Sequence, residues 1–248
     1  MDRIFSEVCG IAKERRRIVQ AGSLWMAVQY TAIHSNDQSV RREAKAQIST
    51  PARESLNAKL SWQKLMLLLA ANFRKTDLVV GLDYRVEALP KRREDADRKL
   101  TNFINALRKV RREQGQELIY VRVTEGYHSG GRLHHHLIIN STGEDYEVIR
   151  RLWKHADTVD FELFGPDGPE RWGKYLTKEP REKGRRHVGD RTWRASIHMK
   201  KPIVTTELVD ERDRLLPPAG AFIVDSTSCE NCYGRFCQIM AVLPESQN

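Results

Sequence analysis

Two neighbouring segments with alternating side chains constrain the fold of this chain more than any other feature. In residues 117–125 (ELIYVRVTE), Ile119, Val121 and Val123 alternate with polar or larger residues, and residues 132–140 read RLHHHLIIN. A period of two is typical of a β-strand with one buried face. The intervening GYHSGG is rich in glycine and favours a turn. The two segments therefore predict a β-hairpin.

Three consecutive histidines begin the second strand of this hairpin. Successive side chains of a strand point to opposite faces, so His134 and His136 share one face and His135 lies on the other. Imidazole is a common metal ligand, and two on one face, about 6–7 Å apart along the strand, can chelate one ion. A lone histidine is usually an ordinary packed or surface residue. Three in a row at the mouth of an apolar strand favour a metal site.

The segments around the hairpin complete an α+β pattern. The order is a strand at 78–84, a helix, the hairpin, a helix through Trp153, a strand at 158–164, a helix at 170–179 and a strand at 192–199. Strands and helices in this order predict a five-stranded antiparallel sheet of RRM-like or ferredoxin-like type, with helices on one face.

The rest of the chain divides the sequence into three parts. Residues 1–72 are predicted to form an N-terminal helical extension, because charged runs alternate with apolar positions and Leu65, Leu68 and Leu69 have helical spacing. Residues 73–200 hold the α+β domain. Residues 201–248 are less regular and are predicted to form an irregular C-terminal extension.

The charge balance indicates a polyanionic partner. The chain has 248 residues, with Lys plus Arg at 42 and Asp plus Glu at 33, which gives a formal net charge of +9. Such an excess favours nucleic acid, although a merely basic surface has the same composition. No apolar run approaches the roughly 18 residues of a membrane span, and the N-terminus lacks a signal-peptide layout. We therefore expect a cytoplasmic protein with no membrane contact.

Three further segments carry possible chemistry. In RWGKYLTKEP, Tyr175 and Lys178 share a helix face, which suits a tyrosine nucleophile beside an ammonium, although Tyr-x-x-Lys is also common on helix surfaces. Residues 179–194 are basic and include Trp193, as suits a DNA backbone with a base stacked on an aromatic ring. The segment CENCYGRFC, with Cys229, Cys232 and Cys237, is half of a zinc site or a set of free thiols.

Taken together, these motifs resemble the HUH endonucleases, and within them the single-tyrosine rolling-circle replication initiators (Rep proteins) of plasmids and phages. DLVVGLDYR (77–85) is similar to the first strand motif of that family. GRLHHHLIIN matches its metal-binding motif, and WGKYLTKEP matches the motif that supplies the nucleophile.

The resemblance implies a reaction and a set of residues. A divalent ion, Mg²⁺ or Mn²⁺, is held by His134, His136 and a third polar residue, for which we predict Glu125, with His128 as the substitute. Strict alternation puts Glu125 on the apolar face of its strand, so Glu125 must stand at the strand end or beside a bulge. Tyr175 attacks the scissile phosphate and becomes a 5′-phosphotyrosine, while Lys178 orients the phenolate or the phosphate. Residues predicted to bind DNA are Lys174, Arg181, Arg185, Arg186, Arg132 and Trp193.

The partners implied are single-stranded DNA at a replication origin, a host helicase and a polymerase. Two alternatives stay open at this point. One is a related HUH transposase or relaxase that uses the same chemistry on another DNA structure. The other is a non-catalytic RRM-like module that binds nucleic acid and carries incidental histidines.

Overall fold

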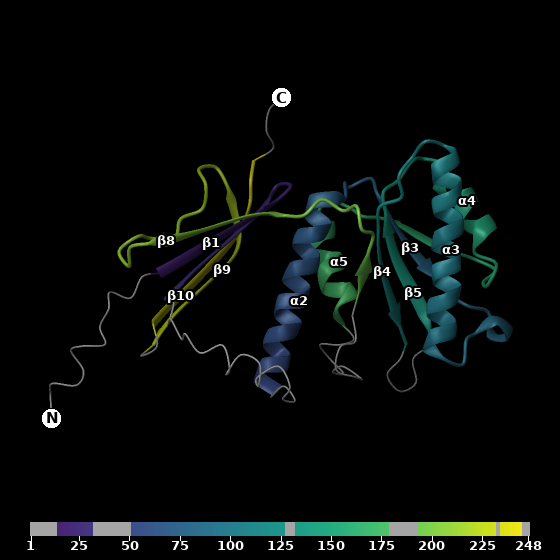
Figure 1. The fold of residues 1–248 in the computed structure, drawn as a ribbon, viewed down its shortest axis with the longest axis horizontal. Coiled ribbons are helices and arrows are strands. Elements are labelled where there is room, and N and C mark those ends of the chain that lie inside the picture. The colour runs from purple at the N-terminus through teal and green to yellow at the C-terminus, as the bar shows by residue number, and fades with distance from the viewer. Residues whose placement is uncertain (1–13, 32–50, 127–131, 179–192, 232–233, 245–248) are drawn as a thin grey trace. The chain divides into compact units, whose positions relative to one another are not determined.

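The computed structural model describes residues 14–31, 51–126, 132–178, 193–231 and 234–244 (Figure 1). The chain divides into two compact units. One contains residues 50–200, and the other combines residues 1–49 with residues 201–248. Each unit is built on its own five-stranded antiparallel sheet.

The sheet of residues 50–200 has the predicted α+β architecture. Its strands are β3 (Leu78–Leu82), β4 (Tyr120–Glu125), β5 (His134–Ile139), β6 (Asp160–Leu163) and β7 (Arg194–Ala195). They lie in the order β6-β3-β5-β4-β7, and every pairing is antiparallel. The first four strands have the order of a ferredoxin-like split β-α-β unit. The predicted hairpin is confirmed as β4 and β5.

Helices lie on both faces of this sheet. Helices α3 (Arg93–Glu113) and α4 (Asp145–Leu152) cover one face, and α2 (Pro51–Asn72) and α5 (Gly168–Leu176) lie on the other side (Figure 1). A short 3₁₀ turn, Val86–Ala88, precedes α3. The prediction of helices on one face is therefore wrong. The second face is apolar along Val79, Val121 and Ile138, so it needs its own cover, which α2 and α5 supply.

The second unit corrects two further predictions. Its strands are β1 (Glu14–Ala21), β2 (Leu24–Thr31), β8 (Ile203–Val209), β9 (Phe222–Asn231) and β10 (Gly234–Val242), in the order β8-β1-β2-β10-β9. Residues 14–31 are thus a β-hairpin rather than helices, and most of 201–244 is a sheet rather than irregular chain. The two-residue loop between β1 and β2 uses Gly22 at φ 58°, as tight hairpins require. Only α2 of the expected helical extension is helical among the described residues, and α2 lies within the 50–200 unit.

Two sequence features have a simpler outcome. Within the described ranges, no helix is both long and apolar enough to cross a membrane. Cys229 and Cys237 lie on β9 and β10 as free thiols, whereas Cys232 falls outside the described residues. Zinc binding by these cysteines stays a prediction.

Candidate metal centre and nucleophile

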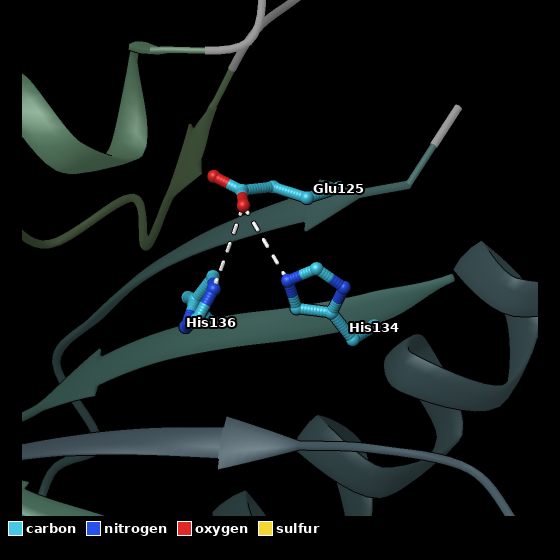
Figure 2. Close-up of side chains that lie close together, drawn as sticks. All are labelled: Glu125, His134 and His136. Atoms are coloured by element: carbon cyan, nitrogen blue, oxygen red, sulfur yellow. Dashed lines mark ion pairs between the residues drawn. The ribbon is translucent and has the colours of Figure 1, made fainter. Parts of the chain in front are cut away.

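The hairpin brings three candidate ligands together at the open end of the sheet. Glu125 is the last residue of β4 and pairs in register with His134, the first residue of β5. His136 follows two residues later on the same face. The Oε2 atom of Glu125 lies 3.4 Å from His134 Nε2 and 3.6 Å from His136 Nε2 (Figure 2). One ligand atom from each of the three residues lies within 4.8 Å of the others.

Alternation along β4 explains how a carboxylate comes to stand on an apolar face. Val121, Val123 and Glu125 share this face, and Val121 and Val123 are buried in the core beneath α2 and α5. Ile138 belongs to that core and His136 lies on the same face of β5. The core thus ends at the strand ends, where the polar site begins. Glu125 occupies the predicted strand-end position, and its regular pairing with His134 requires no bulge.

The Glu125 carboxylate has the environment of an ionised metal ligand. Its side chain is only 4% exposed. Burial alone would raise the pKa of this carboxyl, but hydrogen bonds from His134 and His136 and the charge of Lys178 outweigh burial and hold the pKa well below its usual range. All of these contacts reach Oε2. The other oxygen, Oε1, is buried and has no hydrogen-bond partner among the residues that the structure describes. A buried oxygen of this kind is available to a cation.

His134 is oriented by a backbone contact. Its Nδ1 lies 2.9 Å from the carbonyl oxygen of Arg132 and donates to it, which leaves Nε2 facing Glu125. Metal-binding histidines commonly use the second ring nitrogen in this way. The hydrogen bond to Glu125 raises the pKa of His134 against the effect of burial, and the charge of Asp83 adds to the rise. Sequence analysis missed Asp83, whose only signal was its place at the end of the 78–84 strand motif.

The geometry and the donor set fit a divalent ion. Metal–ligand bonds of about 2.0–2.2 Å place two ligands of one ion roughly 3–3.4 Å apart, and the Glu125–histidine separations of 3.4 and 3.6 Å are close to this. Two imidazoles and one carboxylate would leave further coordination positions for water or substrate. Imidazole favours Mn²⁺ over Mg²⁺ in affinity, whereas carboxylate suits both.

Gly126 makes the tight exit from β4 possible. Its φ is 91°, a left-handed conformation that only glycine adopts readily, and a Cβ there would collide with the backbone carbonyl of Arg132. That carbonyl is the group that orients His134. Residue 126 therefore has to be glycine for Glu125 and His134 to meet.

Helix α5 delivers Tyr175 to the same place. The Tyr175 hydroxyl lies 3.4 Å from His136 Nε2, and the two rings are 5.0 Å apart in an edge-to-face arrangement. The tyrosine side of α5 is anchored by Trp172, whose indole nitrogen donates to the Phe164 carbonyl at 3.2 Å. Tyr175 itself is 37% exposed, so a substrate can reach its hydroxyl.

Lys178 links the tyrosine to the carboxylate. Its Nζ lies 3.2 Å from Glu125 Oε2 and 3.6 Å from the centre of the Tyr175 ring. Partial burial would lower the pKa of this ammonium, but the hydrogen bond with Tyr175 and the charge of Glu125 raise it above the ordinary value. Lys178 is therefore a fixed positive charge beside the tyrosine.

The residues predicted to bind DNA divide into two groups. Lys174 is exposed one residue before Tyr175 and pairs with Glu170 at 2.5 Å. Arg132 donates to the Tyr84 carbonyl, and Trp193 is half-buried against α2, where its indole nitrogen donates to Ser61 Oγ at 3.4 Å. The other predicted residues lie outside the described residues: Arg181, Arg185, Arg186 and the substitute ligand His128.

Comparison with known families identifies the segment that carries this site. Residues 77–187 match the family model of the replication-associated protein ORF2. The match supports a replication-initiator family, and the matched segment holds the candidate ligands, Tyr175 and Lys178. Searches of curated proteins and of solved structures gave no match.

Proposed function

We propose that this protein nicks and joins single-stranded DNA at a specific sequence or structure, through a 5′-phosphotyrosyl intermediate on Tyr175. It would act as a single-tyrosine HUH endonuclease that starts rolling-circle replication of a plasmid or phage. One observation carries the proposal: the Tyr175 hydroxyl lies 3.4 Å from a histidine of the Glu125, His134 and His136 group. A nucleophile beside a candidate metal centre is the arrangement that phosphoryl transfer requires.

The residues present support each part of the reaction. A bound divalent ion, held by Glu125, His134 and His136, would supply Lewis-acid polarisation of the scissile phosphate. The Tyr175 oxygen forms a bond to phosphorus, the bond from phosphorus to the 3′ oxygen breaks, and the released 3′ oxygen takes a proton to become a hydroxyl. Lys178 stabilises the phenolate as Tyr175 loses its proton. Attack of a 3′-hydroxyl on the phosphotyrosine reverses the step and joins DNA ends.

The basic groups around α5 and α2 supply a path for the DNA strand. Lys174 lies next to Tyr175 in sequence, and its Nζ is 5.6 Å from the centre of the Trp62 ring on α2. Lys64 of α2 lies 6.0 Å from the centre of the Trp193 ring. Cations beside indole rings suit a phosphate backbone whose bases stack on aromatic side chains. We include the origin, a host helicase and a host polymerase as partners in this proposal.

The test is a cleavage assay on single-stranded DNA from the replicon that encodes the protein. Substrates labelled at the 5′ or 3′ end are incubated with Mn²⁺, with Mg²⁺ or with EDTA. We expect metal-dependent cleavage that is lost in Tyr175→Phe and in the double variant His134→Ala/His136→Ala. Tyr146→Phe, which removes an exposed hydroxyl from α4, is the matched control and should cleave normally.

Two other outcomes would favour the alternatives. Tight binding without cleavage on any tiled fragment would contradict the nicking proposal and support a binding module. Cleavage confined to hairpin ends or to a transfer origin would support a transposase or relaxase with the same site.

A further inference from the structure

His135 lies on the opposite face of β5 from the candidate ligands and is fully buried. Its Nε2 is 2.6 Å from the Tyr84 hydroxyl, and its Nδ1 is 2.9 Å from Thr124 Oγ1. Thr124 in turn lies 3.4 Å from the Asp97 carboxylate on α3. A neutral imidazole in this core has both ring nitrogens engaged, and neither contact involves the metal face.

The chemistry of the groups gives this chain of hydrogen bonds a direction. A carboxylate accepts only, so the Thr124 hydroxyl donates to Asp97. The Thr124 oxygen is then free to accept from the His135 Nδ1–H, and Nε2, which carries no proton, accepts from the Tyr84 hydroxyl. The chain therefore runs from Tyr84 through His135 and Thr124 to Asp97, and Asp97 sets the tautomer of His135.

This chain lies where the backbone stops holding β5 in place. The last pair between β3 and β5 is Leu82 with His135, so His134 lies one residue beyond the reach of β3. On its other side β5 pairs with β4 through Thr124 and Glu125. Tyr84, two residues after β3 ends, reaches His135 with its side chain and so extends the tie between the two strands past the end of their ladder.

The outer end of the chain is rigid. The Tyr84 ring is 1% exposed and packs edge-to-face against Trp153, with ring centres 5.3 Å apart. Trp153 is fixed by donating from its indole nitrogen to the Asp83 carbonyl at 2.8 Å. The Tyr84 carbonyl also accepts from the Arg132 guanidinium, which anchors the residue that enters β5.

We propose that the Tyr84–His135–Thr124–Asp97 chain is a positioning device that fixes the ligand-bearing end of β5, and so sets the affinity of the metal site on the other face. The inference rests on the proposed metal site of the proposed function. His135 is a positioning residue here, because it touches neither metal nor DNA. Its two neighbours in sequence, His134 and His136, receive the benefit, since a strand that cannot twist keeps both imidazoles directed at Glu125.

The test measures Mn²⁺ affinity of the full-length protein, by the electron paramagnetic resonance signal of free Mn²⁺, and does not depend on cleavage. Tyr84→Phe and Thr124→Val each delete one hydroxyl and keep the shape of the side chain. We expect each to weaken Mn²⁺ binding about tenfold, the lower end of what loss of ligand-orienting contacts costs. The double variant should be hardly worse than either single one, because the chain is already broken.

Three controls separate positioning from general stability. Thr124→Ser keeps the hydroxyl and should bind Mn²⁺ like the wild type. Tyr120→Phe, another tyrosine of the same sheet, should leave Mn²⁺ affinity unchanged. Nitrogen-15 spectra of the metal-free wild type should show one buried histidine protonated at Nδ1, and this signal should change in Thr124→Val.

The outcomes distinguish the two proposals. Variants that lose thermal stability but keep wild-type Mn²⁺ affinity would overturn the positioning role and leave the metal site standing. A wild-type protein that binds no Mn²⁺ would overturn the metal site, and with it both proposals. A His135 protonated at Nε2 would overturn the direction of the chain.

Discussion

Glu125 shows how far a single residue can be predicted from its sequence. The alternation of β4 places it on an apolar face, and the resemblance to HUH endonucleases suggests a ligand; the structure reconciles the two by ending the strand there. What the sequence could not give is the burial of Oε1 or the reach of Lys178, because both depend on α5 packing across the sheet. His135 likewise looked like a filler between two ligands, and its partner Tyr84 lies 51 positions away.

Metal binding should depend on pH through His134. The pKa of His134 is raised above 6.5 by Glu125, so the metal-free protein holds a proton on this ring over a range in which a free imidazole is neutral. A metal ion must displace that proton, so Mn²⁺ affinity should rise by about tenfold per pH unit until His134 is neutral. Isothermal titration from about pH 6 to about pH 8.5, a range that brackets the ordinary histidine pKa, measures this. Glu125→Gln should bind Mn²⁺ more weakly at every pH, and an affinity independent of pH in the wild type would contradict the assignment.

The buried His135 should make the protein sensitive to acid. Burial lowers its pKa to about 3 in the folded protein, against 6.5 when unfolded. Between these values only the unfolded chain takes up the proton, so the stability contributed by neutral His135 is complete above about pH 6.5 and is lost as pH falls towards about 3. From about pH 7 to about pH 5 the wild type should lose about 2 kcal/mol more unfolding free energy than His135→Leu. Urea denaturation at both pH values checks this, and equal losses would refute it.

At the scale of elements, local patterns predicted well and long-range pairing did not. Helix α3 and the β4–β5 hairpin have strong periodicity and near-neighbour partners, and both were predicted from sequence. Strand β1 was misread as helix because Arg15, Arg16 and Arg17 resemble a solvated helix face. Its second neighbour, β8, begins about 180 residues later in the sequence, so no local signal indicates the pairing.

The contact between α2 and α5 should be sensitive to a single methyl group. A Cβ on Gly173 would lie 3.2 Å from Met66 Cβ and 3.4 Å from the Trp62 ring, so the helices must separate to accept it. We expect Gly173→Val to destabilise the protein by about 1–3 kcal/mol. Because α5 carries Tyr175, cleavage should fall more than Mn²⁺ affinity does. Thermal denaturation and Mn²⁺ titration on the same sample check both, and an equal loss of cleavage and metal affinity would argue against α5 as the element that positions the tyrosine.

At the scale of the whole molecule, the two units differ in what they show. The unit of residues 50–200 contains the candidate site and the whole of the segment matched by the replication-associated family. The other unit joins the two ends of the chain in one sheet, an arrangement that the sequence did not reveal because its halves are separated by the whole of the first unit.

The net charge of +9 should make DNA binding strongly dependent on salt. If about four phosphates are neutralised, the affinity for single-stranded DNA should fall roughly 50-fold between about 50 and about 200 mM salt. Fluorescence anisotropy with a labelled oligonucleotide measures this, and Lys64→Ala/Lys174→Ala should flatten the slope. Binding that does not change with salt would contradict a path built on lysine and arginine.

The most direct test of the central claim is the mass of the protein–DNA adduct. The wild-type protein is incubated with Mn²⁺ and an oligonucleotide that contains the nick site, digested with protease and nuclease, and analysed by mass spectrometry. The account predicts a nucleotide linked through its 5′ phosphate to Tyr175, absent with EDTA and absent in Tyr175→Phe. Cleavage without any adduct, or an adduct that persists in Tyr175→Phe, would contradict it.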